Sequence, residues 1–414
     1  MRLSEASFCS FISKGFTRYC YNTNMKTYHN DVVAFLQKLI QTPSVNGKNG
    51  EAAVVEVIRA EASKLGLPHR VIAKDNNRPN IFVGEDFKGT NEVLRGAHLD
   101  TVPVGETSAW THPPFSGILE NERLYGRGAI DCKGGIAMSL YALKLLKDAG
   151  KLHTAKFVGV ADEESGADST LGLRYLLDEG LNARTAVYTY GGNADGSHLT
   201  IGHRGLVRLW VTCHGESIHS GSKEWQDKKR GSNAIDGLID LLSELREFAL
   251  PGENKYFPGY RSVLTPTLIE GGAGESIVPD RAKVLLDIRL LPEHRNAEVI
   301  SETTELTKRL SDGRRTFTIE VKNNLPGVLT DPNSDIVKRA LKLNKELFGV
   351  DSSLKGSGPA NESYMLISRG IPTITGYGPF GANFHSANEY ALTDSINTLL
   401  TLLSRLAGEV VDLD

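Results

Sequence analysis

Four short polar clusters in this sequence carry side chains that can bind a metal ion or move a proton. They are His98-Leu99-Asp100, Gly126–Gly135, Ala161–Gly166 and Phe384–Glu389. Each falls at the end of an expected element of an α/β layer, which is where open sheets bind their ligands. Together they offer two imidazoles and several carboxylates, a nitrogen and oxygen donor set suited to Zn²⁺ or a similar divalent ion.

The first cluster predicts a metal ligand with a carboxylate beside it. Residues 93–103 form an apolar run closed by Pro103, which indicates a buried strand that ends in a loop. If the strand continues through Asp100, His98 and Asp100 point to one face, and the carboxylate can orient the imidazole ring. A His–Asp hydrogen bond at a strand end, without a metal, is the simpler alternative.

Two further clusters each offer one candidate ligand. Asp131 precedes a predicted helix whose Gly134-Gly135 start lets backbone approach closely, so it suits either a metal site or the N-cap of that helix. His385 lies in a loop rich in glycine and phenylalanine. For His385 the alternative is a structural or merely exposed histidine.

Glu163 and Glu164 follow a short buried strand, and adjacent carboxylates can divide the work of a metal site. One binds the ion, while the other stays free as the general base for a water molecule whose pKa the ion lowers to about 7. The alternative is an ordinary solvated turn.

Length and composition are those of an ordinary globular protein. The 414 residues suggest two or three domains at about 150 residues each. A formal net charge of -3, with no Lys/Arg block among aromatics, gives no sign of nucleic-acid binding. No apolar run reaches the length of a membrane span. The four cysteines form no CxxC pair and fit a reducing compartment, so we expect a cytoplasmic protein without nucleic-acid or membrane partners.

The order of the expected elements predicts a catalytic domain interrupted by an insertion. Residues 1–25 are polar and aromatic and are expected to form an unstructured extension. Strands alternate with helices in residues 26–203 and again in 327–414, which indicates an α/β fold with a mixed, mostly parallel sheet flanked by helices. Residues 204–326 fit a ferredoxin-like α+β insertion, a small antiparallel sheet with two helices. The first helix is expected to begin behind Asn30 and Asp31, which suit the N-cap.

In their order along the chain, the four clusters resemble the M20 metallopeptidase family. Acetylornithine deacetylases, succinyl-diaminopimelate desuccinylases, aminoacylases and carboxypeptidase G-type enzymes belong to it. The matching motifs are His98-Leu99-Asp100-Thr101-Val102-Pro103, Gly-Arg-Gly-Ala-x-Asp-x-Lys-Gly-Gly around Asp131, Asp162-Glu163-Glu164 and the His385 loop. The resemblance runs from about Thr27 to the C-terminus. It implies a zinc-exopeptidase-like catalytic domain and an inserted lid domain that forms a homodimer.

The resemblance also implies roles for the residues of the clusters. It implies one or two metal ions per chain, Zn²⁺ or in its place Co²⁺ or Mn²⁺. Glu163 matches the general base, and Asp100 matches the carboxylate that orients a neighbouring histidine. The matching ligands are the bridging Asp131, His98 and His385 on different ions, and Glu164.

Three residues of the insertion match the family as well. His219, in Ile218-His219-Ser220-Gly221, resembles the histidine that stabilises the tetrahedral oxyanion, often in the partner subunit's site. Asn233 and Arg289 resemble groups that hold the carboxylate of the substrate, and a guanidinium can grip a carboxylate through two parallel hydrogen bonds. Without the resemblance, His219 would be a polar loop residue and Arg289 a charge on a strand surface.

The sequence departs from the family where an acidic ligand follows the strand expected at residues 186–190. Gly191 stands at that position, and Asp195 lies a few residues later, from where a remodelled loop could bring it into the site. Without such a replacement the second ion lacks a ligand. Ser276 replaces a usual Asn, and Pro359–Glu362 departs from a usual Thr/Ser-Asp pairing, which leaves the substrate class open.

The sequence therefore predicts a metal-dependent hydrolase that cleaves an amide bond with Glu163 as general base. The expected substrate is an N-acyl amino acid or a short peptide with a free carboxylate. The alternative, motivated by Gly191, is a catalytically impaired member of the family that acts as a binding or dimerising protein, because a fold alone does not fix a function.

Overall fold

The computed structural model describes residues 23–191, 196–246, 248 and 250–407 of the chain. They form two compact units. The first contains the described residues up to Ile201, Thr330–Lys355 and those from Met365 onward, and the second contains Gly202–Leu329 and Gly356–Tyr364. All but the last three residues of the expected extension, residues 1–25, lie outside the described part. No helix among the described residues has both the length and the apolar character needed to cross a membrane.

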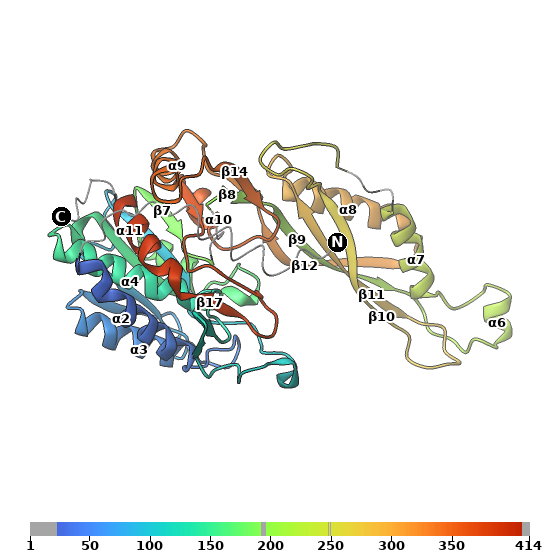
Figure 1. The fold of residues 1–414 in the computed structure, drawn as a ribbon. Helices are drawn as coiled ribbons and strands as arrows, with labels where there is room; N and C mark the ends of the chain where they lie inside the picture. Colours follow the sequence, from blue (N-terminus) through green and yellow to red (C-terminus); the bar gives the residue numbers. More distant parts are fainter. Residues whose placement is uncertain (1–22, 192–195, 247, 249, 408–414) are drawn as a thin grey trace, which may run out of the picture. The chain divides into compact units, whose positions relative to one another are not determined.

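A mixed sheet forms the centre of the first unit (Figure 1). Its strands follow the order β1, β2, β6, β3, β7, β15, β8. The pairs β6–β3, β3–β7 and β7–β15 are parallel, whereas the flanking pairs are antiparallel. The predicted α/β class with a mixed sheet flanked by helices is confirmed, but parallel pairing, predicted for most of the sheet, is confined to its middle. The strands are β1 (His69–Ile72), β2 (Asn80–Val83), β3 (Val93–His98), β6 (Ala155–Val160), β7 (Thr185–Tyr188), β8 (His198–His203) and β15 (Thr373–Thr375).

Helix α4 (Lys133–Asp148) is the central helix of this unit. It packs against β3 and β6 and is buried on nearly all sides, because α2 and α11 also contact it. A Cβ on Gly135 would lie 1.9 Å from the carbonyl oxygen of Thr189, so the start of α4 fits against the end of β7 only with glycine there. The other helices are α2 (Thr23–Ile40), α3 (Glu51–Lys64), α5 (Leu173–Asp178), α9 (Asp335–Phe348), α10 (Tyr364–Ile367) and α11 (Ile396–Leu406).

The expected start of the first helix was wrong. Helix α2 begins at Thr23, so Asn30 and Asp31 lie inside it. These two residues are polar, but the helix continues through them, and Tyr28, N-terminal to both, lies against the Tyr141 ring of α4 and donates a hydrogen bond to Asp148.

A small antiparallel sheet joins two loops that are far apart in the sequence. Its strands follow the order β16, β17, β5, β4, and Tyr390 on β17 lies opposite Tyr125 on β5. The loop that precedes α4 and the loop that carries His385 are therefore held side by side. The strands are β4 (Ile118–Glu120), β5 (Arg123–Tyr125), β16 (Gly381–Ala382) and β17 (Tyr390–Leu392).

The second unit contains the residues predicted as the insertion together with Gly356–Tyr364, and its antiparallel sheet follows the order β10, β11, β9, β12. Helices α7 (Ala234–Leu245) and α8 (Asn296–Leu310) pack on one face of it. Alternate residues of β9 and β11 point into the core between sheet and helices, as half-buried strands require. Other elements of this unit are β9 (Gly205–His214), β10 (Val263–Gly271), β11 (Arg281–Leu290), β12 (Thr316–Leu325) and α6 (Lys223–Gln226). Two short strands, β13 (Val328–Leu329) and β14 (Ser353–Ser357), pair with β8 of the mixed sheet.

Candidate metal centre

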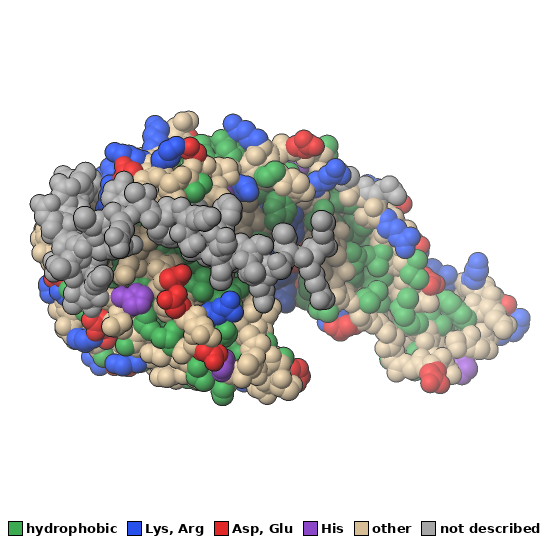
Figure 2. Space-filling model, viewed as in Figure 1, with side chains coloured by type: hydrophobic (Ala, Val, Ile, Leu, Met, Phe, Trp, Pro, Cys, Tyr) green, Lys and Arg blue, Asp and Glu red, His purple; other side chains and the backbone are tan. Residues whose placement is uncertain are grey.

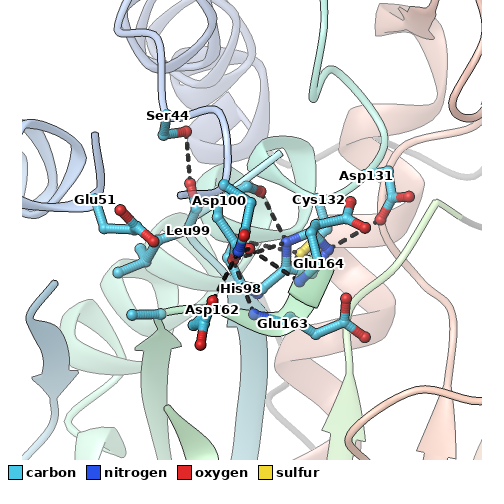
Figure 3. A network of polar contacts seen from close by, with 12 residues as sticks. Ser44, Glu51, His98, Leu99, Asp100, Asp131, Cys132, Asp162, Glu163 and Glu164 are labelled. Carbon is cyan, nitrogen blue, oxygen red and sulfur yellow. Dashed lines mark hydrogen bonds and ion pairs between the residues drawn. The ribbon is translucent and has the colours of Figure 1, made fainter. Parts of the chain in front are cut away.

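His98 is the last residue of the buried central strand β3, and its side chain is fully buried. Figure 3 shows the polar network to which it belongs. Its Nε2 lies 3.0 Å from Oδ1 of Asp131, and its Nδ1 lies 2.9 Å from the backbone carbonyl oxygen of Asp100. An imidazole whose Nδ1 is held by a carbonyl presents Nε2 as its ligand atom. The geometry therefore points Nε2 at Asp131.

Asp131 stands between the two candidate histidines. Its Oδ1 contacts His98, and its Oδ2 lies 2.9 Å from Nε2 of His385. His385 comes from the loop between β16 and β17, whereas Asp131 comes from the loop before α4. Each carboxylate oxygen thus faces one imidazole, so Asp131 could serve as a ligand together with either histidine.

Glu389 holds the loop that carries Asp131. Its two carboxylate oxygens accept hydrogen bonds from the backbone N–H groups of Gly128, Ile130 and Asp131, at 3.0, 3.0 and 3.3 Å. Oε2 of Glu389 also lies 2.7 Å from Nη1 of Arg127, and both side chains are almost fully buried. This buried ion pair fixes the backbone from which the Asp131 side chain projects.

Asp100 organises the acidic turn rather than the imidazole alone. Its carboxylate accepts the backbone N–H groups of Glu163 and Glu164, at 3.1 and 2.9 Å. The same carboxylate lies 3.7 Å from Nδ1 of His98, farther than the backbone carbonyl of Asp100. The turn, a 3₁₀ helix at Glu163–Ser165, is thereby placed beside the end of β3.

A network of hydrogen bonds and ion pairs holds the Glu163–Ser165 turn in place. Asn46 donates hydrogen bonds to Asp100 and to Asp162, at 2.7 and 2.9 Å. Asp162 has a left-handed backbone conformation and also pairs with Nη1 of Arg78 at 2.7 Å. The second arm of that guanidinium contacts the buried Glu51. These charges are buried in pairs, as burial of charge requires.

The side chain of Glu164 shows whether these residues fit a metal ion. Its Oε1 is buried and, in the described part of the chain, has no hydrogen-bond partner; the nearest cationic atom is Nε2 of His385 at 3.6 Å. One donor atom each from His98, Asp131 and Glu164 lie within 4.8 Å of one another. A buried carboxylate oxygen without a partner is costly, so the residues present fit a divalent cation.

The electrostatics of the cluster follow from its crowding. Burial, together with the negative charges of Glu164 and Asp131, raises the pKa of Glu163 to about 8. The hydrogen bond with Asp131 and the nearby carboxylate of Glu164 raise the pKa of His385 to about 10. Burial opposes the ionisation of Asp131, but hydrogen bonds with His385 and His98 outweigh it and hold the Asp131 pKa well below its usual value.

The position of the missing acid is closely packed. The N–H of Gly191 donates to the carbonyl of Ile130 at 3.0 Å. A Cβ on Gly191 would lie 2.9 Å from Cζ of Phe384 and 3.0 Å from Cβ of Ile130. Asp195, the expected substitute, lies outside the described residues.

The remaining candidates lie in the second unit, each with its own partners. His219 is exposed, and its Nδ1 accepts the N–H of Gly221 at 3.0 Å. Asn233 is the N-cap of α7 and accepts the N–H of Ile235 at 2.9 Å. Arg289 donates through Nε and Nη2 to Asp287, at 2.6 and 3.2 Å, which fixes the direction of its guanidinium.

Sequence reasoning gave no role to three side chains that the structure places at the site. They are Arg127, Glu389 and Tyr190, whose hydroxyl lies 2.9 Å from Oε1 of Glu163. Arg127 and Glu389 fall within the polar clusters, which was the available signal, whereas nothing around Tyr190 distinguishes it from a core aromatic.

The chain is similar to known proteins over most of its length. A sequence model described as Peptidase family M20/M25/M40 matches residues 94–409. A succinyl-diaminopimelate desuccinylase of Novosphingobium aromaticivorans is 28% identical over 389 residues, which are 91% of this chain and 98% of that protein. An N-formyl-4-amino-5-aminomethyl-2-methylpyrimidine deformylase of Halalkalibacterium halodurans is 26% identical over 90% of this chain and 93% of its own length.

Solved structures share the fold. An M20 family metallo-carboxypeptidase from Sulfolobus solfataricus matches with a TM-score of 0.74 at 20% identity, over 91% of this chain and 98% of that one. A dinuclear metal binding peptidase of the M20 family from Bacillus subtilis matches with a TM-score of 0.68 at 15% identity, over 92% and 98%.

The Arg127–Glu389 pair predicts a large loss of stability on substitution. Glu389→Gln leaves the buried guanidinium without its anion, so the free energy of unfolding should fall by about 3–5 kcal/mol, measured by urea denaturation. The matched control is Asp178→Asn, at an exposed pair with Arg369 in the same unit, where about 0–1 kcal/mol is expected. Equal effects of the two substitutions would contradict the role given to Glu389.

Proposed function

The chain belongs to peptidase family M20/M25/M40 and is a metal-dependent hydrolase of amide bonds; from this premise we propose that it cleaves an N-acyl amino acid or a short peptide that carries a free carboxylate. The observation that carries the proposal is the convergence of His98, Asp131 and Glu164, with His385 beside them. The desuccinylase and the deformylase among its relatives are named for the removal of acyl groups, which supports a deacylase.

We propose Zn²⁺ as the ion, with Co²⁺ or Mn²⁺ as substitutes, because imidazole and carboxylate donors suit it. Asp131, Glu164 and His385 would hold one ion, and His98 with Asp131 would hold a second, for which Asp195 is the proposed acid. Bound there, the metal polarises the scissile carbonyl and lowers the pKa of a water molecule to about 7.

Glu163 is the proposed general base. It is a buried carboxylate next to the proposed ligand Glu164, which suits a group that accepts a proton from the attacking water and later delivers it to the leaving amine. Asp100 fixes the main chain of Glu163 through a backbone hydrogen bond, so the carboxylate need not be reorganised during the reaction.

The second unit supplies the proposed substrate contacts. Arg289 and Asn233 would hold the substrate carboxylate, and His219 would stabilise the oxyanion, in this chain or in its partner. Asp287 supports the proposal for Arg289, because its two hydrogen bonds hold the guanidinium in one direction.

We also propose a homodimer formed through the second unit. Hydrophobic side chains gather on the visible face of that unit (Figure 2). Leu268 and Ile269 of the edge strand β10 are more than half exposed, and exposed apolar edges favour association. A cytoplasmic location is proposed because Cys132 and Cys213 are buried free thiols, which fits a reducing compartment.

The proposed function predicts that activity depends on bound metal. Elemental analysis of protein purified without chelator should find one or two ions per chain, and hydrolysis of a panel of N-acyl amino acids and dipeptides should stop when chelator removes them. Restoring Zn²⁺ should restore turnover. Absence of both metal and turnover would favour a binding or dimerising protein instead.

Glu163→Gln should lower kcat by about 10²–10⁴-fold, because the amide cannot accept a proton. Metal content should stay unchanged, since Glu163 is not a proposed ligand. The matched control is Glu179→Gln, at an exposed acid of the same unit, which should leave kcat and metal content as they are. Substantial residual turnover in Glu163→Gln would rule out the assignment of the base.

Arg289→Ala should raise KM by about 10–100-fold for substrates with a free carboxylate, because a charge-assisted hydrogen-bond pair is lost. For a substrate whose carboxylate is replaced by a carboxamide, the KM values of the unmodified protein and of Arg289→Ala should be about equal. Parallel losses on the two substrates would show that Arg289 does not hold the carboxylate.

A further inference from the structure

Tyr190 stands at the carboxyl end of β7, two residues beyond the strand, at the same sheet edge as the metal centre. Its backbone is fixed on both sides. The N–H of Gly378 donates to the Tyr190 carbonyl at 2.7 Å, and the N–H of the next residue, Gly191, donates to Ile130 at 3.0 Å. The direction of the Tyr190 side chain is therefore set by the sheet and by the loop before α4.

The Tyr190 side chain reaches the proposed base. Its hydroxyl donates a hydrogen bond to Oε1 of Glu163 at 2.9 Å. Its ring lies 5.6 Å from the His98 ring and 5.2 Å from the Tyr188 ring, measured between centroids, and both contacts are tilted. The phenol is thus packed between aromatic neighbours with only its hydroxyl directed at Glu163.

Glu163 has few other means of holding its carboxylate. The bond from Asp100 fixes the main chain of Glu163, not the side chain. Among the described residues, the Glu163 carboxylate accepts its hydrogen bond from the hydroxyl of Tyr190. The terminal torsion of a glutamate is broad, so a carboxylate without a partner would sample many directions.

We propose that Tyr190 is a positioning residue for catalysis, which occupies Oε1 of Glu163 and leaves Oε2 as the oxygen that exchanges the proton. The proposal rests on the proposed function and adds to it a residue outside the metal ligands. A base held within a narrow range of directions gives faster proton transfer than one that must be reoriented in each cycle.

The test substitution is Tyr190→Phe, which removes the hydroxyl and keeps the ring. We expect kcat to fall about 10–100-fold, as the loss of a hydrogen bond to a charged group predicts. KM should change less than about 2-fold, and metal content should be unchanged, because no proposed ligand or substrate contact is altered. In a Glu163→Gln background, Tyr190→Phe should lower the residual rate by less than about 2-fold.

The matched control is Tyr188→Phe. Tyr188, the fully buried last residue of β7, lies two residues before Tyr190, and its hydroxyl has no hydrogen-bond partner in the described structure. This substitution should leave kcat within about 2-fold. An equal loss in Tyr188→Phe and Tyr190→Phe would mean that packing, and not the hydroxyl, is responsible, and would overturn the proposal.

A second measurement is independent of turnover. The infrared spectrum of Tyr190→Phe, subtracted from that of the unmodified protein, should show one shifted carboxyl band. The same subtraction between Glu163→Gln and the double variant should show no such shift. If the unmodified protein hydrolyses nothing in the panel, the proposed function fails, and the infrared result still decides whether the hydroxyl holds Glu163. No displaced band, or a normal kcat in Tyr190→Phe, overturns the inference.

Discussion

The candidate centre depends on one carboxylate, Asp131, that meets two imidazoles through its two oxygens. The three side chains come from the end of β3, the loop before α4 and the loop between β16 and β17. These side chains come together only if the two loops are held against each other. The buried ion pair of Arg127 and Glu389 links the two loops, which lie far apart in the sequence. Such a pair costs desolvation energy unless both ions are fully hydrogen-bonded, and here the carboxylate receives three backbone N–H groups as well. The stability of the site is therefore inseparable from the stability of the small sheet.

The fold class could be predicted because its signals are local. Short apolar strands alternating with helices indicate an α/β layer, and alternating strands with two amphipathic helices indicate the insertion. The antiparallel flanks of the main sheet could not be predicted, since pairing direction depends on which strands become neighbours. The start of α2 at Thr23 was missed because Asn30 and Asp31 are good N-cap types, but the helix begins before them, where Tyr28 contacts Tyr141 and Asp148 of α4.

The candidate site was predictable as a set of residues but not as a network. Clustered motifs drew attention to His98, Asp131 and Glu164, which the structure brings together. Asp100 shows the limit of periodicity: the strand ends at His98, so alternation stops, and the Asp100 carboxylate binds the acidic turn while its carbonyl meets the ring. The contact of Tyr190 with Glu163 joins segments that no spacing rule connects.

The acid that is missing at Gly191 matters more for His98 than for His385. His385 has Asp131 and Glu164 as acidic neighbours, at 2.9 and 3.6 Å, whereas the acidic atom closest to His98 Nε2 belongs to Asp131. A side chain at position 191 would meet Phe384 and Ile130, so an acid there would have to displace a ring from the loop that carries His385. A side chain at position 191 therefore requires the half-exposed Phe384 ring to move. An acid introduced at position 191 alone would add a carboxylate for the His98 side of the centre but would displace Phe384 from the loop that carries His385. Replacing Phe384 by a smaller residue at the same time would avoid that displacement.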